Sequence, residues 1–434
     1  MVAVAMTESS EANRAIGTGS PETDLSDSDQ RQLVEAALAN VAPGTRVLAI
    51  IPDKTRDDNT HILFPSASET LANKGVSQLD VLVAQGTHSP MNEAEKLTKI
   101  GLSNFDQGRL FDHHWDDPNE LVTIGELPAD QVKEITGGIF NESIPLTINR
   151  LVEPGRYDRI LVFGATVPHE VAGFAGGAKY FFPGIAGADL THKTHWLAAL
   201  ATIEKIIGRV ETPTRHLIEA AADHISTPII AFTSVVTRTD DDRLRTHAVF
   251  AGDYRSSLRQ AAEVSRHVHI KYTSRKYSRV VALLDEHYED LWLGGKASYR
   301  LGAVIETGGE LIIYAPRLRC ISETHGADIE RFGGYAPIEK IKDLVADSGE
   351  LQSNLCVAAH LAHVSYAGRT GESGEFIPRY RIKLASQVDA DTCRRVNLEY
   401  LDYRTFNVAD YQNDPDTLIV ERAGRDLYLV EPMT

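Results

Sequence analysis

The sequence predicts an α/β protein made of two domains, each built around a parallel or mixed β-sheet. The chain has 434 residues, which is more than one ordinary hydrophobic core accommodates. Short aliphatic and β-branched runs alternate along it with helix-length segments, and these runs fall into two groups. Because they are apolar almost without a break, they are typical of strands that helices cover on both faces.

The first group of elements occupies the N-terminal half. It begins with "SDSDQRQLVEAALANV", in which Ser and Asp residues suited to capping precede an apolar helical stripe, and "APG" ends the helix. We predict strands in this half over residues 46–53, 79–88, 158–169 and 227–236. In the second group we predict strands over residues 277–287, 308–316, 379–388 and 416–432.

The charged stretch 263–279 separates the two groups and is the expected crossing between the domains. We place an N-terminal domain at 26–268 and a C-terminal domain at 269–434, whose last ~15 residues are candidates for returning to the first domain. Residues 1–25 are rich in Ser, Thr, Glu and Gly and lack the basic and apolar regions of a secretory signal. We therefore predict a disordered tail over 1–25.

Composition limits the partners of the protein. A formal net charge of −17 argues against a nucleic-acid surface or a polybasic membrane patch, because both need an excess of Lys and Arg. No apolar run approaches the ~20 residues that span a bilayer. Cys320, Cys356 and Cys393 are isolated, so the sequence indicates neither a disulfide framework nor a thiolate zinc site. We expect a cytoplasmic protein with reduced thiols that binds neither nucleic acid nor membranes.

Polar side chains follow three predicted strands of the first domain. Asp53 and Arg56 come after the first strand, and His88 and His169 end the next two. Ligands of open α/β sheets bind beyond the carboxyl ends of the strands. Histidine suits proton transfer at neutral pH, and Arg suits a carboxylate or phosphate. These residues indicate a site, with a satisfied core or rim histidine and a surface ion pair as the ordinary alternatives.

The stretch "PHEVAGFAGGAKYFFPG" (168–184) combines several glycines with one lysine, Lys179. It is not a Walker A loop, because Tyr180 follows the lysine, and it does not match GxGxxG. Glycines at this density weaken helices and strands, so we expect a loop whose backbone N–H groups approach an anion such as phosphate. The alternative is a tight turn with a solvated lysine. The glycines concerned are Gly173, Gly176 and Gly177.

Downstream, "THKTH" places His192 and His195 three residues apart near the start of a predicted helix, "HWLAALATIEKIIG". Histidines at this spacing can share a helix face and ligate a metal, although capping or exposed histidines are the alternative. Taken by themselves, these residues predict an enzyme that acts on a small anionic substrate and uses a phosphate-bearing cofactor.

Five motifs, in this order, resemble those of the nickel-pincer nucleotide-dependent lactate racemase family. They are "PDKTR" (52–56), "GTH" (86–88), the glycine-rich stretch (168–184), His195 sixteen residues after Lys179, and "GGKAS" with Lys296. The resemblance extends from about residue 45 nearly to the C-terminus. It implies an isomerase, a two-domain α/β racemase or epimerase, with its active site in the cleft between the domains.

The resemblance also implies a cofactor, the nickel-pincer nucleotide (pyridinium-3-thioamide-5-thiocarboxylic acid mononucleotide), attached covalently to Lys179. It makes His195 the nickel ligand, with His192 as the alternative. The residues implied to contact the cofactor are Asp53, Gly173, Gly176, Gly177 and Trp292, with Asp53 on either the cofactor ribose or the hydrogen-bond shell. Cofactor-maturation enzymes are therefore expected partners.

The implied reaction inverts C2 of a small 2-hydroxy acid by hydride transfer to and from the cofactor. In this scheme His88 and His169 exchange the hydroxyl proton on opposite sides of the substrate. Arg56 and Lys296 hold the substrate carboxylate.

Three departures from the family pattern concern the substrate. Leu293 replaces a glutamine of the lactate enzymes, no Trp follows Trp292, and Asp57, Asp58 and Asn59 stand where those enzymes tend to have "RP". These departures favour a substrate larger or more polar than lactate, such as an aldonate. The alternatives are lactate racemase proper and a non-catalytic cofactor carrier or binding protein of the same fold. An NAD-dependent dehydrogenase is disfavoured because the GxGxxG fingerprint is absent.

Overall fold

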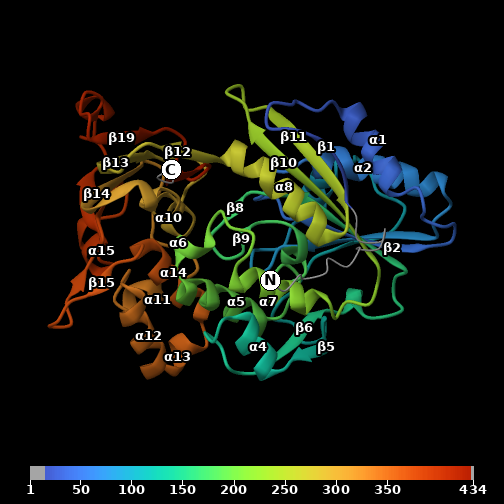
Figure 1. Cartoon of the computed structure of the whole chain (residues 1–434), viewed down its shortest axis with the longest axis horizontal. Helices are drawn as coiled ribbons and strands as arrows, with labels where there is room; N and C mark the ends of the chain where they lie inside the picture. Colours follow the sequence, from blue (N-terminus) through green and yellow to red (C-terminus); the bar gives the residue numbers. More distant parts are fainter. Residues whose placement is uncertain (1–14, 432–434) are drawn as a thin grey trace, which may run out of the picture. The chain divides into compact units, whose positions relative to one another are not determined.

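The computed structural model describes residues 15–431, which form two compact units (Figure 1). Unit 1 comprises the described residues up to Val167 together with Phe174–Thr191 and Arg215–Val268. Unit 2 comprises Pro168–Gly173, His192–Thr214 and the described residues from His269 onward. No helix within residues 15–431 is long and apolar enough to cross a membrane.

Unit 1 is built on seven strands: β1 (Ile16–Gly19), β2 (Arg46–Pro52), β3 (Gln78–Ala84), β4 (Leu110–Phe111), β7 (Arg159–Ala165), β10 (Ile229–Arg238) and β11 (Leu244–Gly252). Their order in the sheet is β1-β11-β10-β7-β2-β3-β4. The strands from β10 to β4 are parallel, and β11 and β1 extend the sheet antiparallel. The mixed α/β sheet predicted from the sequence is therefore confirmed.

Six α-helices lie wholly or mostly within the described residues of unit 1. They are α1 (Asp27–Ala37), α2 (Thr60–Asn73), α3 (Glu93–Ile100), α4 (Ala129–Ile135), α7 (Pro213–Ala222) and α8 (Tyr254–His269). A separate hairpin consists of β5 (Leu121–Leu127) and β6 (Ile144–Asn149). Helix α4 lies beside this hairpin rather than on the seven-stranded sheet (Figure 1). The predicted first helix is confirmed as α1, which begins with a capping box between Ser26 and Asp29.

The core of unit 1 lies between one face of the sheet and helices α1 and α2 (Figure 1). Val47, Ala49 and Ile51, alternate residues of β2, are fully buried there. Phe163 of β7 stacks on Phe232 of β10, with the ring centroids 5.0 Å apart. Because β2, β3 and β7 are buried on both faces, their sequences are continuous apolar runs, which is why the sequence predicts them.

Unit 2 contains a five-stranded parallel sheet made of β13 (Tyr277–Leu283), β14 (Ile305–Ala315), β17 (Arg381–Ser386), β18 (Glu399–Asp402) and β19 (Thr417–Val420). Its order is β18-β17-β14-β13-β19. Two further pairs are β12 (Ile270–Thr273) with β20 (Leu427–Val430), and β15 (Arg369–Thr370) with β16 (Phe376–Ile377). The helices are α9 (Leu291–Gly294), α10 (Lys296–Leu301), α11 (Gly326–Arg331), α12 (Ile338–Asp347), α13 (Gly349–Gln352), α14 (Leu355–Ser365) and α15 (Ala390–Arg395).

The chain ends differ from the sequence-based expectation. Residues 16–19, predicted to be disordered, form strand β1 at the edge of the sheet, where they pair with β11. Arg245 of β11 also donates to the carbonyl of Thr23, which holds the following turn. Residues 1–14 lie outside the described part of the chain. The predicted strand 416–432 is two strands, and β20 pairs with β12 of unit 2, so the last described residues do not return to unit 1.

Two internal segments belong to a different unit from the one that the sequence predicts. Residues 168–173 and 192–214 belong to unit 2, although the sequence places them in the N-terminal domain. Contacts with the rest of unit 2 explain this, since Arg300 donates to the carbonyl of Pro168 at 3.0 Å and Arg379 pairs with Glu204. Gly208 N–H also donates to the carbonyl of Gly173 at 2.9 Å, which joins the two segments. The elements in this part of the chain are β8 (Pro168–His169), β9 (Gly173–Phe174), η3 (Gly177–Tyr180), α5 (Ala188–Ala201) and α6 (Ile203–Ile206).

Candidate active site

In unit 1, the loops after β2 and β3 bring Asp53 and His88 into contact. His88 Nδ1 lies 3.1 Å from Asp53 Oδ2. The other carboxylate oxygen of Asp53 accepts hydrogen bonds from the backbone N–H and the hydroxyl of Thr55, at 2.7 and 2.5 Å. Asp53 is buried, whereas the His88 side chain is 37% exposed. A fixed carboxylate therefore orients an imidazole that remains accessible.

The surroundings keep Asp53 ionised. Burial opposes ionisation, but the hydrogen bond with His88 and the positive charge of half-buried Arg56 outweigh it and hold the pKa of the Asp53 carboxyl well below its usual range. An ionised carboxylate only accepts hydrogen bonds, so the network assigns the Nδ1 proton to His88 as the donor. Neutral His88 then carries its free lone pair on Nε2. This is the tautomer that a general base needs.

The polar residues at 57–59 bond within unit 1. Asp57, Asp58 and Asn59 were expected to favour a polar substrate, but each has a partner in the chain. The partners are Arg238 for Asp57 (2.6 Å), Lys99 for Asp58 (2.5 Å) and Gln30 for Asn59 (2.5 Å). These residues support the loop and the start of α2, so they no longer count in favour of a polar substrate.

The packing of the chain itself requires the glycines of the glycine-rich stretch. Gly173, Gly176 and Gly177 have φ angles of +76°, +99° and +59°, where L side chains are strained. A Cβ at Gly173 would overlap the carbonyl oxygen of Arg209, and one at Gly177 would lie 3.1 Å from the carbonyl oxygen of Tyr254. The glycines thus have a role that does not depend on a ligand, and their contact with a cofactor stays a prediction.

Arg215 of α7 fixes two carbonyl groups of the same stretch. It is fully buried, and its guanidinium donates to the carbonyl of Gly176 at 3.1 Å and to that of Phe174. A buried charge is tolerated only where it is hydrogen-bonded, so these contacts define the path of the loop. The sequence analysis missed Arg215 because nothing in "TPTRHLIE" distinguishes a buried arginine from an exposed one.

Lys179 is half-buried in η3, and its backbone connects to the loop that carries His88. Gly184 N–H donates to the carbonyl of Lys179 at 3.0 Å, and Gly86 N–H donates to the carbonyl of Gly184 at 2.9 Å. Within unit 1, two backbone hydrogen bonds therefore link the predicted cofactor lysine to the loop of a predicted base.

In unit 2, His169 ends β8 and is 8% exposed. Its Nδ1 accepts a hydrogen bond from the backbone N–H of Val171 at 3.1 Å. The same Nδ1 lies 3.7 Å from Oε2 of Glu170. With Nδ1 as an acceptor, the hydrogen-bond network assigns the proton of neutral His169 to Nε2.

Glu170 is a largely buried carboxylate that the sequence analysis did not single out, with a side chain that is 20% exposed. Burial opposes its ionisation, but the charge of His169 in its protonated form and the positive charges of Lys296 and Arg300 outweigh this and hold the pKa of the carboxyl below its usual range. Arg300 of α10 also donates to the carbonyl of Pro168 at 3.0 Å, which ties α10 to the segment that carries His169. The signal was present in the sequence, because Glu170 is the one acidic residue of the glycine-rich stretch.

The predicted nickel ligand lies in α5. This helix begins at Ala188 rather than near His195, so His192 and His195 lie within it, and both are half-buried. The assignment of nickel to His195, with His192 as the alternative, stays a prediction. Trp292 of α9 contacts His325 and His360, with ring centroids 4.5 and 4.2 Å apart, and its contact with a cofactor stays a prediction.

Helix α14 contributes two buried histidines that the sequence analysis also missed. Burial lowers the pKa of His360 to about 3 and that of His363 to about 4, so both are neutral at pH 7. The charge of Glu170 acts on both rings, which places the three side chains in one region of unit 2. The spacing "HLAH" gives the signal in retrospect, because residues three apart share a helix face.

The grouping of possible metal-ligating side chains limits how the protein could hold a metal. Between residues 15 and 431, no three His, Cys, Asp or Glu side chains are grouped as a metal site requires. Side chains alone therefore form no metal centre in that part of the chain. A metal that arrives with ligands of its own needs fewer protein donors, and one half-buried imidazole such as that of His195 suits this arrangement.

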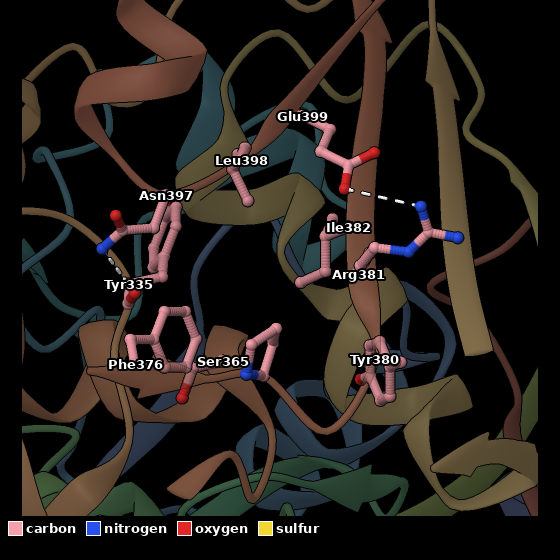
Figure 2. A pocket seen from close by; sticks show the side chains of 10 residues that line it. Tyr335, Ser365, Phe376, Tyr380, Arg381, Ile382, Asn397, Leu398 and Glu399 are labelled. Atoms are coloured by element: carbon pink, nitrogen blue, oxygen red, sulfur yellow. Dashed lines mark hydrogen bonds and ion pairs between the residues drawn. The ribbon is translucent and has the colours of Figure 1, made fainter. Parts of the chain in front are cut away.

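Figure 2 shows a small pocket of unit 2, about 70 Å³ in volume, beside β17. None of the predicted site residues lines it, so it is not the predicted site. Its lining residues are Tyr335, Ser365, Phe376, Pro378, Tyr380, Arg381, Ile382, Asn397, Leu398 and Glu399.

Known proteins share the N-terminal part of the chain, which holds Asp53, His88, His169, Lys179 and His195. Residues 13–206 match the model of the lactate racemase N-terminal domain. Lactate racemases of Lactiplantibacillus plantarum and Thermoanaerobacterium thermosaccharolyticum are 30% and 28% identical over 160 residues. The chain contains a lactate racemase-like N-terminal domain. The aligned part makes up 36% of this chain and 34% of each relative, so the match spans about a third of the length of these lactate racemases.

Solved structures extend the similarity to nearly the whole chain. The crystal structure of a protein from Thermotoga maritima is 30% identical, with a TM-score of 0.85 over 94% of this chain and 99% of that one. The lactate racemase apoprotein of T. thermosaccharolyticum has a TM-score of 0.67 over 93% of each chain, and at 17% identity it shows a common fold alone. Of the predicted site residues, Lys296 and Trp292 lie outside the stretch that matches the lactate racemase N-terminal domain.

Proposed function

We propose that this protein is a member of the lactate racemase family and a racemase or epimerase that inverts C2 of a 2-hydroxy acid with a nickel-pincer nucleotide. The observation that supports this most directly is the Asp53–His88 pair. It is an imidazole held by an ionised carboxylate, and it lies inside the stretch that matches the family. Lys179 and His195 lie in the same stretch.

The chain offers two groups that would hold the cofactor. Lys179 is the proposed attachment point, and the imidazole of His195 is the proposed protein ligand of nickel. Bound there, the cofactor would supply a reversible acceptor for the C2 hydride of the substrate. Asp53 was expected to contact either the cofactor ribose or a hydrogen-bond shell, and its bonds to His88 and Thr55 favour the second role.

The side chains of the protein hold and move the hydroxyl proton. Nε2 of His88 accepts the proton of the 2-hydroxyl, and the carboxylate of Asp53 stabilises the imidazolium that forms. His169 protonates the oxygen when the configuration is inverted, and the two histidines exchange roles in the reverse direction. Arg56 and Lys296 are the proposed partners of the substrate carboxylate.

We further propose a substrate larger or more polar than lactate, such as an aldonate. Leu293, which is 37% exposed, lacks the amide of the family glutamine and so argues against lactate itself. The feature that supports a polar substrate is that α14 carries His360 and His363. Neutral imidazoles each offer one donor and one acceptor, which suits substrate hydroxyls. Lactate is the alternative substrate.

Intact mass and nickel content test the cofactor proposal. The protein is co-expressed with cofactor-maturation enzymes that are shown to load a lactate racemase, and it is compared with Lys179→Ala. We expect a mass increment and nickel in the wild type and in the control Lys205→Ala, which changes an exposed lysine, but neither in Lys179→Ala. An unmodified wild type would remove the basis of the proposal. Loaded protein is then assayed for inversion of gluconate and of lactate.

A further inference from the structure

Each histidine that we propose as a proton carrier has a carboxylate beside Nδ1. Asp53 Oδ2 lies 3.1 Å from His88 Nδ1, and Glu170 Oε2 lies 3.7 Å from His169 Nδ1. Both carboxyl groups have pKa values held below the usual range, so both are anions at neutral pH. The family resemblance assigns no role to Glu170.

The two arrangements differ in what occupies Nδ1. The His88 ring already donates to Asp53, whereas His169 Nδ1 accepts from the backbone N–H of Val171 at 3.1 Å. An imidazolium has a hydrogen on both nitrogens, so protonated His169 can no longer accept from Val171. Its Nδ1–H then needs an acceptor, and Glu170 presents a carboxylate oxygen 3.7 Å away.

The charges around His169 make this carboxylate necessary. Lys296 and Arg300 of α10 both act on Glu170, so two cationic side chains lie in the region where His169 would gain a positive charge. The charge of Glu170 also acts on His360 and His363 of α14, but burial keeps these two rings neutral at pH 7. Glu170 therefore offsets the charge of both cations, and Asp426 acts on Arg300 as well.

We propose that Glu170 is a positioning residue for His169, whose carboxylate accepts the Nδ1 hydrogen of the protonated ring and allows His169 to carry the substrate proton. The proton balance is simple. Nε2 gains the proton from the substrate hydroxyl, the ring becomes an imidazolium, and Glu170 stays ionised. The catalytic part of this proposal rests on the proposed function, whereas the effect of Glu170 on the protonation of His169 does not.

The first test measures the pKa of His169 by NMR in protein without cofactor, labelled with ¹⁵N-histidine and assigned with a His169→Asn variant. Removing the carboxylate charge in Glu170→Gln destabilises the imidazolium, so we expect the pKa of His169 to fall by at least about one unit. Glu170→Asp should restore much of it. The matched control is Glu350→Gln, whose side chain is 63% exposed and pairs with Arg331, and it should leave the pKa unchanged. A His169 pKa that is equal in wild type and Glu170→Gln would overturn the proposal.

The second test measures the pH profile of inversion in loaded protein. In Glu170→Gln, kcat at pH 7 should fall at least about tenfold, the limb of the profile that belongs to His169 should move to lower pH, and KM should change less. A shift in the NMR pKa combined with no inversion of any 2-hydroxy acid by the wild type would sink the proposed function and leave the role of Glu170 standing. If the wild type is active but the NMR pKa of His169 is unchanged in Glu170→Gln, the role of Glu170 is contradicted and the proposed function stands.

Discussion

At the scale of single residues, the proposed chemistry depends on the contact between Asp53 and His88. We predict that Asp53→Asn lowers kcat by roughly 10²-fold or more, because the amide no longer fixes the Nδ1 proton or stabilises the imidazolium. The measurement is the rate of C2 inversion by loaded protein. Asp57→Asn, which changes a 54% exposed carboxylate paired with Arg238, is the matched control and should keep nearly full activity. Equal rates for both variants would show that Asp53 is not needed.

Site residues were predictable from the sequence where they follow the ends of predicted strands. Asp53, His88 and His169 stand out because each follows an apolar run, and β2 and β3 do bring the first two together. Glu170 and Arg215 were not singled out, because burial and partners are set by contacts distant in the sequence. Asp57 and Asp58 show the opposite error, since polar residues near a site also serve to hold its loops.

At the scale of elements, the glycine-rich stretch is fixed by its own backbone. We predict that Gly173→Ala destabilises the protein by more than about 3 kcal/mol, because strain at positive φ adds to an overlap with the carbonyl of Arg209. Gly333→Ala is the matched control: Gly333 has φ +82°, with nothing within 4 Å of an added Cβ, and it should lose only about 1–2 kcal/mol. Denaturant unfolding measures both. Equal losses would mean that the loop adjusts to the methyl group.

Arg215 provides a second test of the same element. Arg215→Met leaves the carbonyls of Phe174 and Gly176 without this donor, at an expected cost of at least about 2 kcal/mol of unfolding free energy. The same variant should load less cofactor onto Lys179, measured by intact mass, because the path of the loop is no longer fixed. Arg31→Met, at a side chain that is 52% exposed, should affect neither quantity. Full loading in Arg215→Met would contradict the role given to Arg215.

Element prediction succeeded where one physical signal was strong. The buried strands β2, β3, β7 and β10 are largely apolar runs, and α1 has a capping box. Strand β1 was missed because "IGTG" carries little β signal and is ordered by its pairing with β11. The start of α5 was placed too late because its first turns contain polar residues that resemble a loop.

At the scale of the whole molecule, buried histidines make stability depend on pH. Burial lowers the pKa of His113 to about 4, and His360 and His363 behave alike. Unfolded histidine titrates near pH 6.5, so between that value and about 4 the unfolded chain binds protons that the folded chain does not. The unfolding free energy should therefore fall as the pH decreases from about 6.5, by roughly 1.4 kcal/mol per pH unit for each histidine.

Denaturant unfolding at pH 7, 6 and 5 checks this dependence. The His113→Gln variant should reduce the slope by about one proton, whereas His267→Gln, at an exposed position, should leave it unchanged. A stability that does not vary between pH 7 and pH 5 would contradict the burial of these rings as neutral groups.

The α/β class of the whole molecule was predictable because the apolar runs repeat along the chain. The membership of residues 168–173 and 192–214 in unit 2 was not, because it depends on long-range contacts such as that between Arg300 and Pro168. Local patterns carry no information about such contacts.

The central claim is that C2 is inverted by moving its hydrogen as a hydride, while histidines move only the hydroxyl proton. The most direct measurement is inversion of gluconate and of lactate by loaded protein in D₂O, with deuterium at C2 determined by NMR and mass spectrometry. The account predicts an inverted product that keeps its original C2 hydrogen, because the hydride returns to the same carbon without meeting solvent. Deuterium at C2 of the inverted product would instead show proton abstraction from carbon and would contradict the account.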